Sequence, residues 1–145
     1  MGFIDSVDTM ILGANTYHQT KDYWPYADDQ GEYGEKLNNL TKYLASSKFD
    51  DAPWGEFPAA TVTRDPAHTL RELKDQHGTD IWLWGSLRLM HSLMDAGLVD
   101  EIRMLVCPAS LGKGTRVFAD RQDRVLAEAT AFENGVALLR YEIKQ

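Results

Sequence analysis

Four short segments place small or hydrogen-bonding residues directly after a predicted strand. They are Gly13 to Thr16, Ser46-Ser47, Thr63-Arg64 and Gly85-Ser86. In α/β sheets, ligands bind at the carboxyl ends of the strands. The four segments together therefore predict a ligand-binding edge. Arg64 is the only residue in them with a permanently charged cationic side chain. For Arg64 the alternative is a solvated charge beside a helix, and for each segment it is a plain turn.

The stretch from Asp80 to Leu87 (DIWLWGSL) carries the strongest of these signals. A short apolar strand stops at Gly85 and runs straight into an amphipathic helix. Backbone N–H groups at a helix start favour an anion without any charged side chain, so this junction is typical of a phosphate site. The dinucleotide fingerprint G-x-G-x-x-G is absent, which argues against an ordinary Rossmann site.

Hydrophobic patterning supplies the elements that must position these segments. Strands are predicted over residues 7–12, 42–45, 59–63, 81–84 and 101–107, and helices over 16–23, 36–40, 66–77 and 87–96. Asn15 is predicted to cap the first helix, and Asp65-Pro66 to start the third. Residues 26–35 and 50–58 are predicted loops. Residues 127–143 are predicted to form a hairpin folded at Asn134-Gly135, a preferred two-residue turn pair.

Strands that alternate with helices, followed by a terminal hairpin, predict an α/β sheet with parallel strands and an antiparallel edge. At 145 residues the chain is most simply one domain, residues 1–145. Its net charge of −7 argues against broad binding of nucleic acid or anionic membranes. The sequence contains no apolar run of membrane-spanning length. One cysteine excludes an internal disulfide, and the four histidines lack metal-ligand spacing, so we expect a cytoplasmic protein without a metal.

Five segments, in order, resemble one known family. They are residues 8–17 (DTMILGANTY), 23–25 (YWP), 80–86 (DIWLWGS), 97–102 (GLVDEI) and 108–118 (PASLGKGTRVF). The chain resembles the dihydrofolate-reductase-like superfamily, and within it the reductase domain of bacterial riboflavin biosynthesis proteins, the RibD C-terminal family. The last segment is the most specific. This resemblance implies a dihydrofolate-reductase-like, mostly parallel sheet flanked by helices, with a C-terminal antiparallel hairpin.

The resemblance also implies a reductase that binds NADPH along the carboxyl edge of the sheet. Carried over by position, the expected cofactor-binding residues form three groups. Gly13, Asn15 and Thr16 would lie by the phosphates, Ser46, Ser47 and Arg64 by the adenosine ribose and its 2′-phosphate, and Gly85, Ser86 and Leu87 by the pyrophosphate. The implied substrate is a small heterocycle such as a pyrimidine or pteridine, as for 5-amino-6-(5-phosphoribosylamino)uracil reductase or dihydrofolate reductase. The implied assembly is a homodimer.

Two departures from the family pattern favour an alternative function. Ala14 stands where many relatives have arginine, which should weaken phosphate binding unless Arg64 or Lys48 compensates. Relatives also carry a strand and a Ser-Leu-Asp-Gly-type segment ahead of the strand that contains Asp8. We therefore expect a truncated start, a neighbour that fills the gap, or a rearranged sheet. The resemblance identifies no catalytic acid here, and the alternative is a non-catalytic or nucleotide-binding oligomer that retains the fold.

Overall fold

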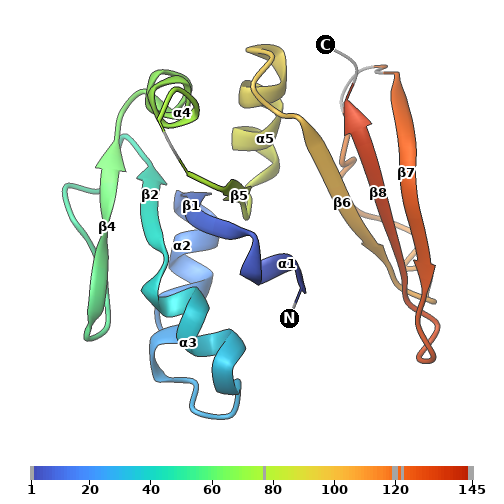
Figure 1. The fold of residues 1–145 in the computed structure, drawn as a ribbon, viewed down its shortest axis with the longest axis horizontal. Coiled ribbons are helices and arrows are strands. Elements are labelled where there is room, and N and C mark those ends of the chain that lie inside the picture. The colour runs from blue at the N-terminus through green and yellow to red at the C-terminus, as the bar shows by residue number, and fades with distance from the viewer. Residues whose placement is uncertain (1, 77, 119–120, 122, 144–145) are drawn as a thin grey trace. The chain divides into compact units, whose positions relative to one another are not determined.

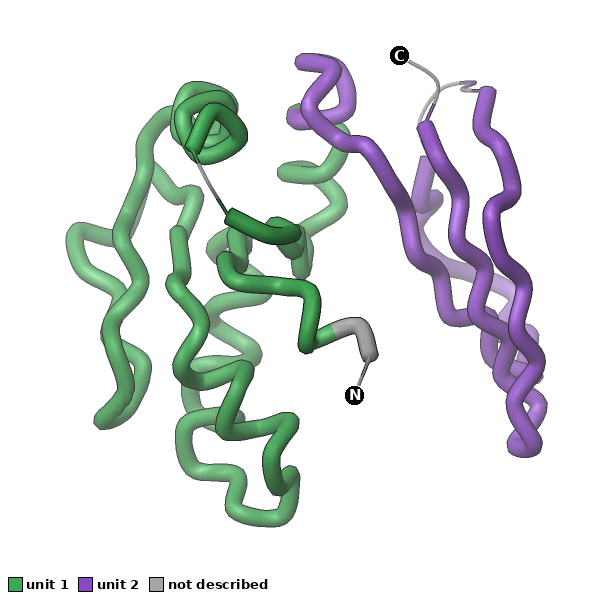
Figure 2. The backbone as a smooth tube through the Cα atoms, in the orientation of Figure 1, with its two compact units in different colours: residues 1–92 green, residues 93–145 purple. Residues whose placement is uncertain are grey.

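The computed structural model describes residues 2–76, 78–118, 121 and 123–143 (Figure 1). The chain divides into two compact units, Met1–Ser92 and Leu93–Gln145 (Figure 2). Each unit has its own β-sheet. The predicted α/β class is confirmed, with a mostly parallel sheet, flanking helices and a C-terminal antiparallel hairpin.

The first unit contains a five-stranded sheet in the order β3-β4-β2-β1-β5. Its strands are β1 (Val7–Gly13), β2 (Thr41–Ala45), β3 (Ala52–Trp54), β4 (Phe57–Thr63) and β5 (Asp80–Leu83). Strands β4, β2, β1 and β5 are parallel neighbours, and β3 is antiparallel to β4. The four predicted parallel strands therefore exist, with ends that differ by one or two residues.

The register of these strands brings their carboxyl ends to one edge. Gly13 pairs with Ala45, and Ala45 pairs with Thr63. On the other side of β1, Ile11 pairs with Leu83, two residues before Gly85. The four segments that are predicted to form a ligand-binding edge therefore all follow strand ends at the same edge of the sheet, as the parallel order requires.

Helical elements precede and follow these strands along the chain, and the boundary between the two units falls within the last of them. The helical elements are α1 (Gly2–Asp5), α2 (Ala14–Thr20), η1 (Trp24–Tyr26), α3 (Gly31–Asn39), α4 (Pro66–Lys74) and α5 (Leu87–Asp95). The predicted start of α4 is confirmed, because the Asp65 carboxylate accepts a hydrogen bond from the His68 N–H at 3.1 Å. The predicted cap of α2 is wrong. Gly13, not Asn15, holds that position, since the helix begins directly at the end of β1.

Two predicted loops contain regular structure. Helix α3 begins at Gly31, inside the predicted loop 26–35, because the acidic segment carries an amphipathic pattern that buries Leu37 and Asn38. Strand β3 lies inside the predicted loop 50–58. There Pro53 is tolerated because β3 is an edge strand of this sheet.

The core of the first unit combines aliphatic side chains with one buried polar cluster. Met10, Leu12, Leu37 and Leu44 are fully buried, as is Trp54. The Trp54 indole N–H donates to the Asn38 side-chain oxygen at 2.7 Å, and the Asn38 amide donates to the Trp24 carbonyl at 2.9 Å. Lys42, also buried, donates to the carbonyls of Asn38 (2.6 Å) and Leu40 (3.0 Å). This cluster ties α3 and η1 to β2 and β3.

The second unit is an antiparallel sheet in the order β6-β8-β7. Its strands are β6 (Glu101–Val106), β7 (Arg124–Ala131) and β8 (Ala137–Ile143). The predicted strand at residues 101–107 is confirmed as β6, which pairs along its length with β8 and so belongs to this second sheet. One face of this sheet carries an ion-pair cluster, in which Arg140 contacts Glu101 at 3.1 Å and Glu128 at 3.3 Å.

The predicted hairpin is confirmed, but its turn differs from the predicted two-residue type. The Phe132 N–H donates to the Val136 carbonyl at 2.9 Å, and the Gly135 N–H donates to the Phe132 carbonyl at 3.0 Å. Gly135 has φ of +87°, and no described non-glycine residue has a positive φ. A two-residue type I′ turn needs positive φ at both positions, so Asn134 does not form one. The turn instead runs from Phe132 to Gly135, and Gly135 takes its last position.

Candidate functional site

Two glycine-containing turns meet where β1 and β5 end. The Gly13 N–H donates to the Gly85 carbonyl at 2.7 Å, and one step earlier the Trp84 N–H donates to the Ile11 carbonyl at 3.1 Å. The peptide bond between Gly85 and Ser86 is cis. The two hydrogen bonds hold the backbone of one turn against the backbone of the other.

Neither glycine has room for a side chain. A Cβ on Gly13 would lie 2.9 Å from Ser86 Oγ and 3.2 Å from the Ser86 nitrogen, and a Cβ on Gly85 would lie 2.7 Å from Thr16 Oγ1. Gly85 also has φ of +122°, which side-chain-bearing residues rarely adopt. The contact thus requires glycine at both positions, because Ser86 and Thr16 fill the space that a side chain would take.

Helix α5 begins directly after this contact. The Ser86 carbonyl accepts the first helical hydrogen bond, from the Met90 N–H at 2.9 Å. The N–H groups of Leu87 and the following residues form the first turn, where backbone donors have no acceptor within the helix. The positive end of the helix therefore lies at the carboxyl edge of the sheet, next to Gly13 and Thr16.

A second cluster forms where β2 and β4 end. The Ser46 N–H donates to the Thr63 carbonyl at 3.2 Å. The Arg64 guanidinium donates through Nη1 to the Ser46 carbonyl at 2.5 Å and through Nη2 to Asp50 at 3.1 Å. Ser46 Oγ accepts from the Lys48 N–H at 3.0 Å, which closes a tight turn. Arg64 is thus held at the edge of the sheet.

The structure places every predicted site residue at this edge, in two clusters on neighbouring strands. Gly13, Thr16, Gly85 and Ser86 form the first cluster, and Leu87 continues from it; Ser46 and Arg64 form the second. Asn15 and Ser47 are exposed residues that flank them, in α2 and after β2. The assignment of all these residues, in both clusters, to a cofactor stays a prediction.

Asp50 is a residue of this site that the sequence did not reveal. It lies in the predicted loop 50–58, 14 positions before Arg64, and its contact with Arg64 exists only because β2 and β4 are adjacent. An aspartate in an acidic loop gives no local signal of such a contact, so only the strand order could have found it.

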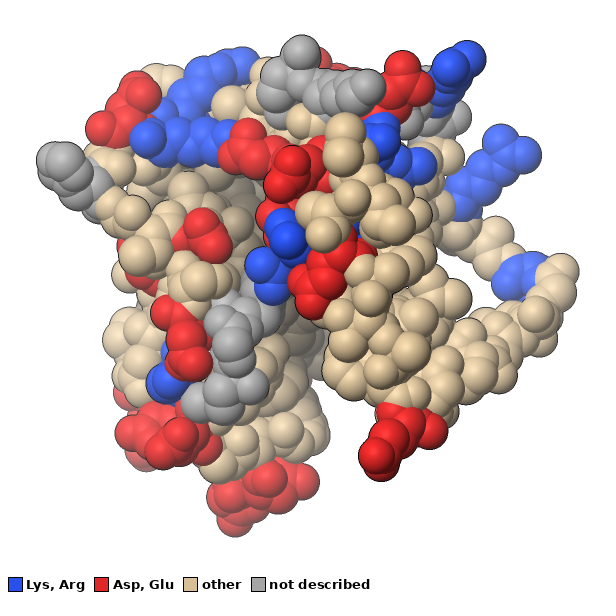
Figure 3. Space-filling view, turned by 45° about the vertical axis from the view of Figure 1, so that its right-hand side comes forward, with Lys and Arg blue, Asp and Glu red and all other residues tan. Residues whose placement is uncertain are grey.

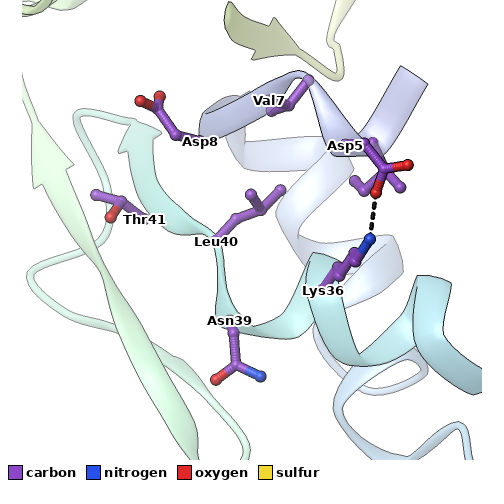
Figure 4. Close-up of a pocket in the computed structure, with 8 residues that line it drawn as sticks. Asp5, Val7, Asp8, Lys36, Asn39, Leu40 and Thr41 are labelled. Atoms are coloured by element: carbon purple, nitrogen blue, oxygen red, sulfur yellow. Dashed lines mark hydrogen bonds and ion pairs between the residues drawn. The ribbon is translucent and has the colours of Figure 1, made fainter. Parts of the chain in front are cut away.

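A cavity of about 320 Å³ lies at the opposite end of the strands (Figure 4). Its lining includes Val7 and Asp8, at the start of β1, and Thr41, at the start of β2. Lys36 forms an ion pair with Asp5 beside it. The cavity is therefore distinct from the edge that carries Gly13 and Gly85.

Charged side chains of both signs lie next to one another at several places on the face shown in Figure 3. Within the described part of the chain, no group of three His, Cys, Asp or Glu side chains is placed to hold a metal ion. No described helix has both the length and the apolar character needed to cross a membrane.

Comparisons with known proteins cover both units. The model of the RibD C-terminal domain matches residues 4–138. YyaP of Bacillus subtilis (strain 168), an uncharacterized protein, is 26% identical over 145 residues, with 96% of this chain and 76% of YyaP covered.

Solved structures of other proteins share the fold. A putative riboflavin biosynthesis protein from Shewanella sp. PV-4 superposes with a TM-score of 0.77 at 14% identity, covering 99% of this chain and 78% of that one. A pyrimidine reductase-like protein from Corynebacterium diphtheriae gives 0.65 at 16% identity, covering 96% and 77%.

Proposed function

The chain belongs to the RibD C-terminal domain family, and on this premise we propose that it is an NADPH-dependent reductase of a small heterocyclic substrate. The observation that carries the proposal is the contact between the glycine turns at Gly13 and Gly85, at the carboxyl edge of the parallel sheet. The names of the two structural relatives, a riboflavin biosynthesis protein and a pyrimidine reductase-like protein, support a pyrimidine as the substrate.

The glycine contact has the features that a diphosphate requires. The absence of side chains at Gly13 and Gly85 lets the two turns pack together, which brings Ser86 and Thr16 to the start of α5. The first turn of α5 supplies backbone donors and a positive helix end, which favour an anion without a neutralising side chain. In this proposal Leu87 and Ser86 hold the pyrophosphate, and Asn15 and Thr16 contact the adjoining phosphate oxygens.

The second cluster fits the adenosine end of the same cofactor. Arg64 is the cation at the carboxyl ends of β2 and β4, and its guanidinium is fixed by the Ser46 carbonyl. A guanidinium binds a phosphate through paired hydrogen bonds, which suits the 2′-phosphate that distinguishes NADPH from NADH. Ser46 and Ser47 would then lie beside the ribose.

When bound, the cofactor supplies the hydride, and the chain supplies placement. The turns at Gly13 and Gly85 would hold the diphosphate, and Arg64 would hold the adenosine end. Placement of this kind lowers the entropic barrier to reaction, because the reacting groups no longer have to find one another.

The second candidate function is nucleotide binding without turnover, in an oligomer that retains the fold. Ala14 favours it, because no side-chain cation accompanies the first glycine turn. Family resemblance also leads us to propose a cytoplasmic homodimer, which light scattering of the purified protein tests for its oligomeric state.

Calorimetric titration with NADPH, followed by an assay of NADPH oxidation with 5-amino-6-(5-phosphoribosylamino)uracil, separates these functions. The reductase proposal predicts binding and substrate-dependent oxidation. Binding without oxidation of this or related pyrimidines and pteridines supports the second candidate. Absence of binding at millimolar NADPH contradicts the reductase proposal and, for the second candidate, excludes NADPH as the nucleotide.

A further inference from the structure

The cation at the second cluster already has an anionic partner within the chain. Arg64 Nη2 lies 3.1 Å from an Asp50 carboxylate oxygen, while Nη1 donates to the Ser46 carbonyl. The Asp50 side chain is 99% exposed and that of Arg64 is 51% exposed. The contact therefore faces solvent, where a bound phosphate would have to arrive.

From this arrangement, and resting on the proposed function, we propose that Asp50 determines cofactor preference by competing with the 2′-phosphate of NADPH for Arg64. The carboxylate and the phosphate are both acceptors for guanidinium N–H groups, so Asp50 occupies one of the donors of Arg64 that a phosphate could use. NADH lacks that phosphate, and its binding does not depend on the exchange.

Two properties of the ion pair determine how strong this competition is. An exposed ion pair is weak, because water screens the charges and both side chains lose rotamer freedom, so a phosphate can displace Asp50. The displaced carboxylate remains near the phosphate and repels it. Both effects lower affinity for NADPH relative to NADH, by about three- to tenfold in total for a pair this exposed.

The Ser46 carbonyl keeps the Arg64 guanidinium in one position, so the competition takes place there. Its hydrogen bond with Nη1 holds the guanidinium against the end of β2 and uses a different nitrogen from the contact with Asp50. Removal of Asp50 therefore frees one donor without releasing Arg64. The expected result is a stronger phosphate site in the same place.

The test measures dissociation constants of the full-length protein for NADPH and NADH by calorimetry at low salt. Asp50→Asn should tighten NADPH about three- to tenfold and change NADH less than twofold. Asp28→Asn is the matched control, because it changes net charge equally in an exposed loop before α3. It should alter neither constant. The gain from Asp50→Asn should shrink at high salt.

A double-mutant cycle with Arg64→Ala separates competition from simple repulsion. The gain from Asp50→Asn should fall to the level of the Asp28→Asn control when Arg64 is absent. A gain that persists in full overturns competition for Arg64, and unchanged or weaker NADPH binding by Asp50→Asn overturns the role of Asp50 altogether. In both cases wild-type binding of NADPH leaves the proposed function standing. Failure of the wild type to bind either dinucleotide contradicts the proposed function and this inference together.

Discussion

Gly13 and Gly85, 72 positions apart in the sequence, are joined by a backbone hydrogen bond of 2.7 Å. The bond exists because β1 and β5 are parallel neighbours that end together. It places the start of α2 against the start of α5, so the two turns form one surface. The candidate phosphate site depends on this contact.

Gly13→Ala should damage both stability and cofactor binding. The new Cβ would lie 2.9 Å from Ser86 Oγ, so one of the two turns must shift. We expect the free energy of unfolding to fall by about 1–3 kcal/mol, the usual cost of overpacking. NADPH affinity should fall about tenfold or more, because the donors of the Ser86 turn lose their alignment.

Gly114→Ala is the control for the added methyl group, because a Cβ at Gly114 meets no described atom within 4 Å. Denaturant unfolding of both variants should show a lower free energy of unfolding for Gly13→Ala alone. Equal stability of Gly13→Ala and the wild type would contradict the close contact between the turns.

Lys42 should make stability depend on pH. Burial lowers the pKa of its ammonium group from 10.5 to about 8 in the folded protein. Between these two values the unfolded chain binds more protons than the folded one, so the free energy of unfolding rises with pH. From about pH 8 to 9.5 we expect a gain of about 1–2 kcal/mol from this residue.

Lys42→Met isolates this contribution, because it keeps an unbranched apolar stem and removes the titrating group. Unfolding should be followed at several pH values below about 9.5, where tyrosines contribute little. The unfolding free energy of the wild type minus that of the variant should increase as the pH rises. A difference that stays constant would contradict the lowered pKa.

Asn38→Leu should destabilise the first unit by about 1–3 kcal/mol, because it leaves the buried Trp54 indole N–H without its acceptor. The neighbouring Asn39→Leu is a matched control. Asn39 is exposed and donates only to a carbonyl of its own helix, so its loss should cost less than about 0.5 kcal/mol. Similar losses for the two variants in denaturant titrations would argue against the buried cluster.

Asp65→Ala should cost about 1 kcal/mol, since it removes the acceptor for the His68 N–H at the start of α4. Asp65→Asn retains a capping oxygen and should stay close to the wild type. The midpoint of thermal unfolding distinguishes them. If the alanine variant matched the asparagine variant, the cap would have no energetic role.

Local sequence signals predicted the helices and strands that are determined by residues of their own segment. Asp65-Pro66 marks a helix start by its own side chain and ring, and the apolar runs before Gly13 and Gly85 mark the parallel strands. From those strand ends alone the common edge could be predicted, because parallel order places carboxyl ends together.

The features that were missed depend on tertiary context. Strand β3 contains Pro53 and forms only because β4 offers an edge, and β6 lies in a second sheet because β8 pairs with it. The Arg64–Asp50 contact depends on the adjacency of β2 and β4. Each of these pairings joins residues from two separate segments, so the hydrophobic periodicity of one segment could not predict it.

Titration of the full-length protein with NADPH, beside Gly85→Ala, tests the central claim most directly. Gly85 has φ of +122° and its added Cβ would lie 2.7 Å from Thr16 Oγ1, so the variant should bind at least tenfold more weakly. Saturable wild-type binding that the substitution weakens is the predicted result. Wild-type protein that shows no binding at millimolar NADPH, or a variant that binds as tightly, would contradict it.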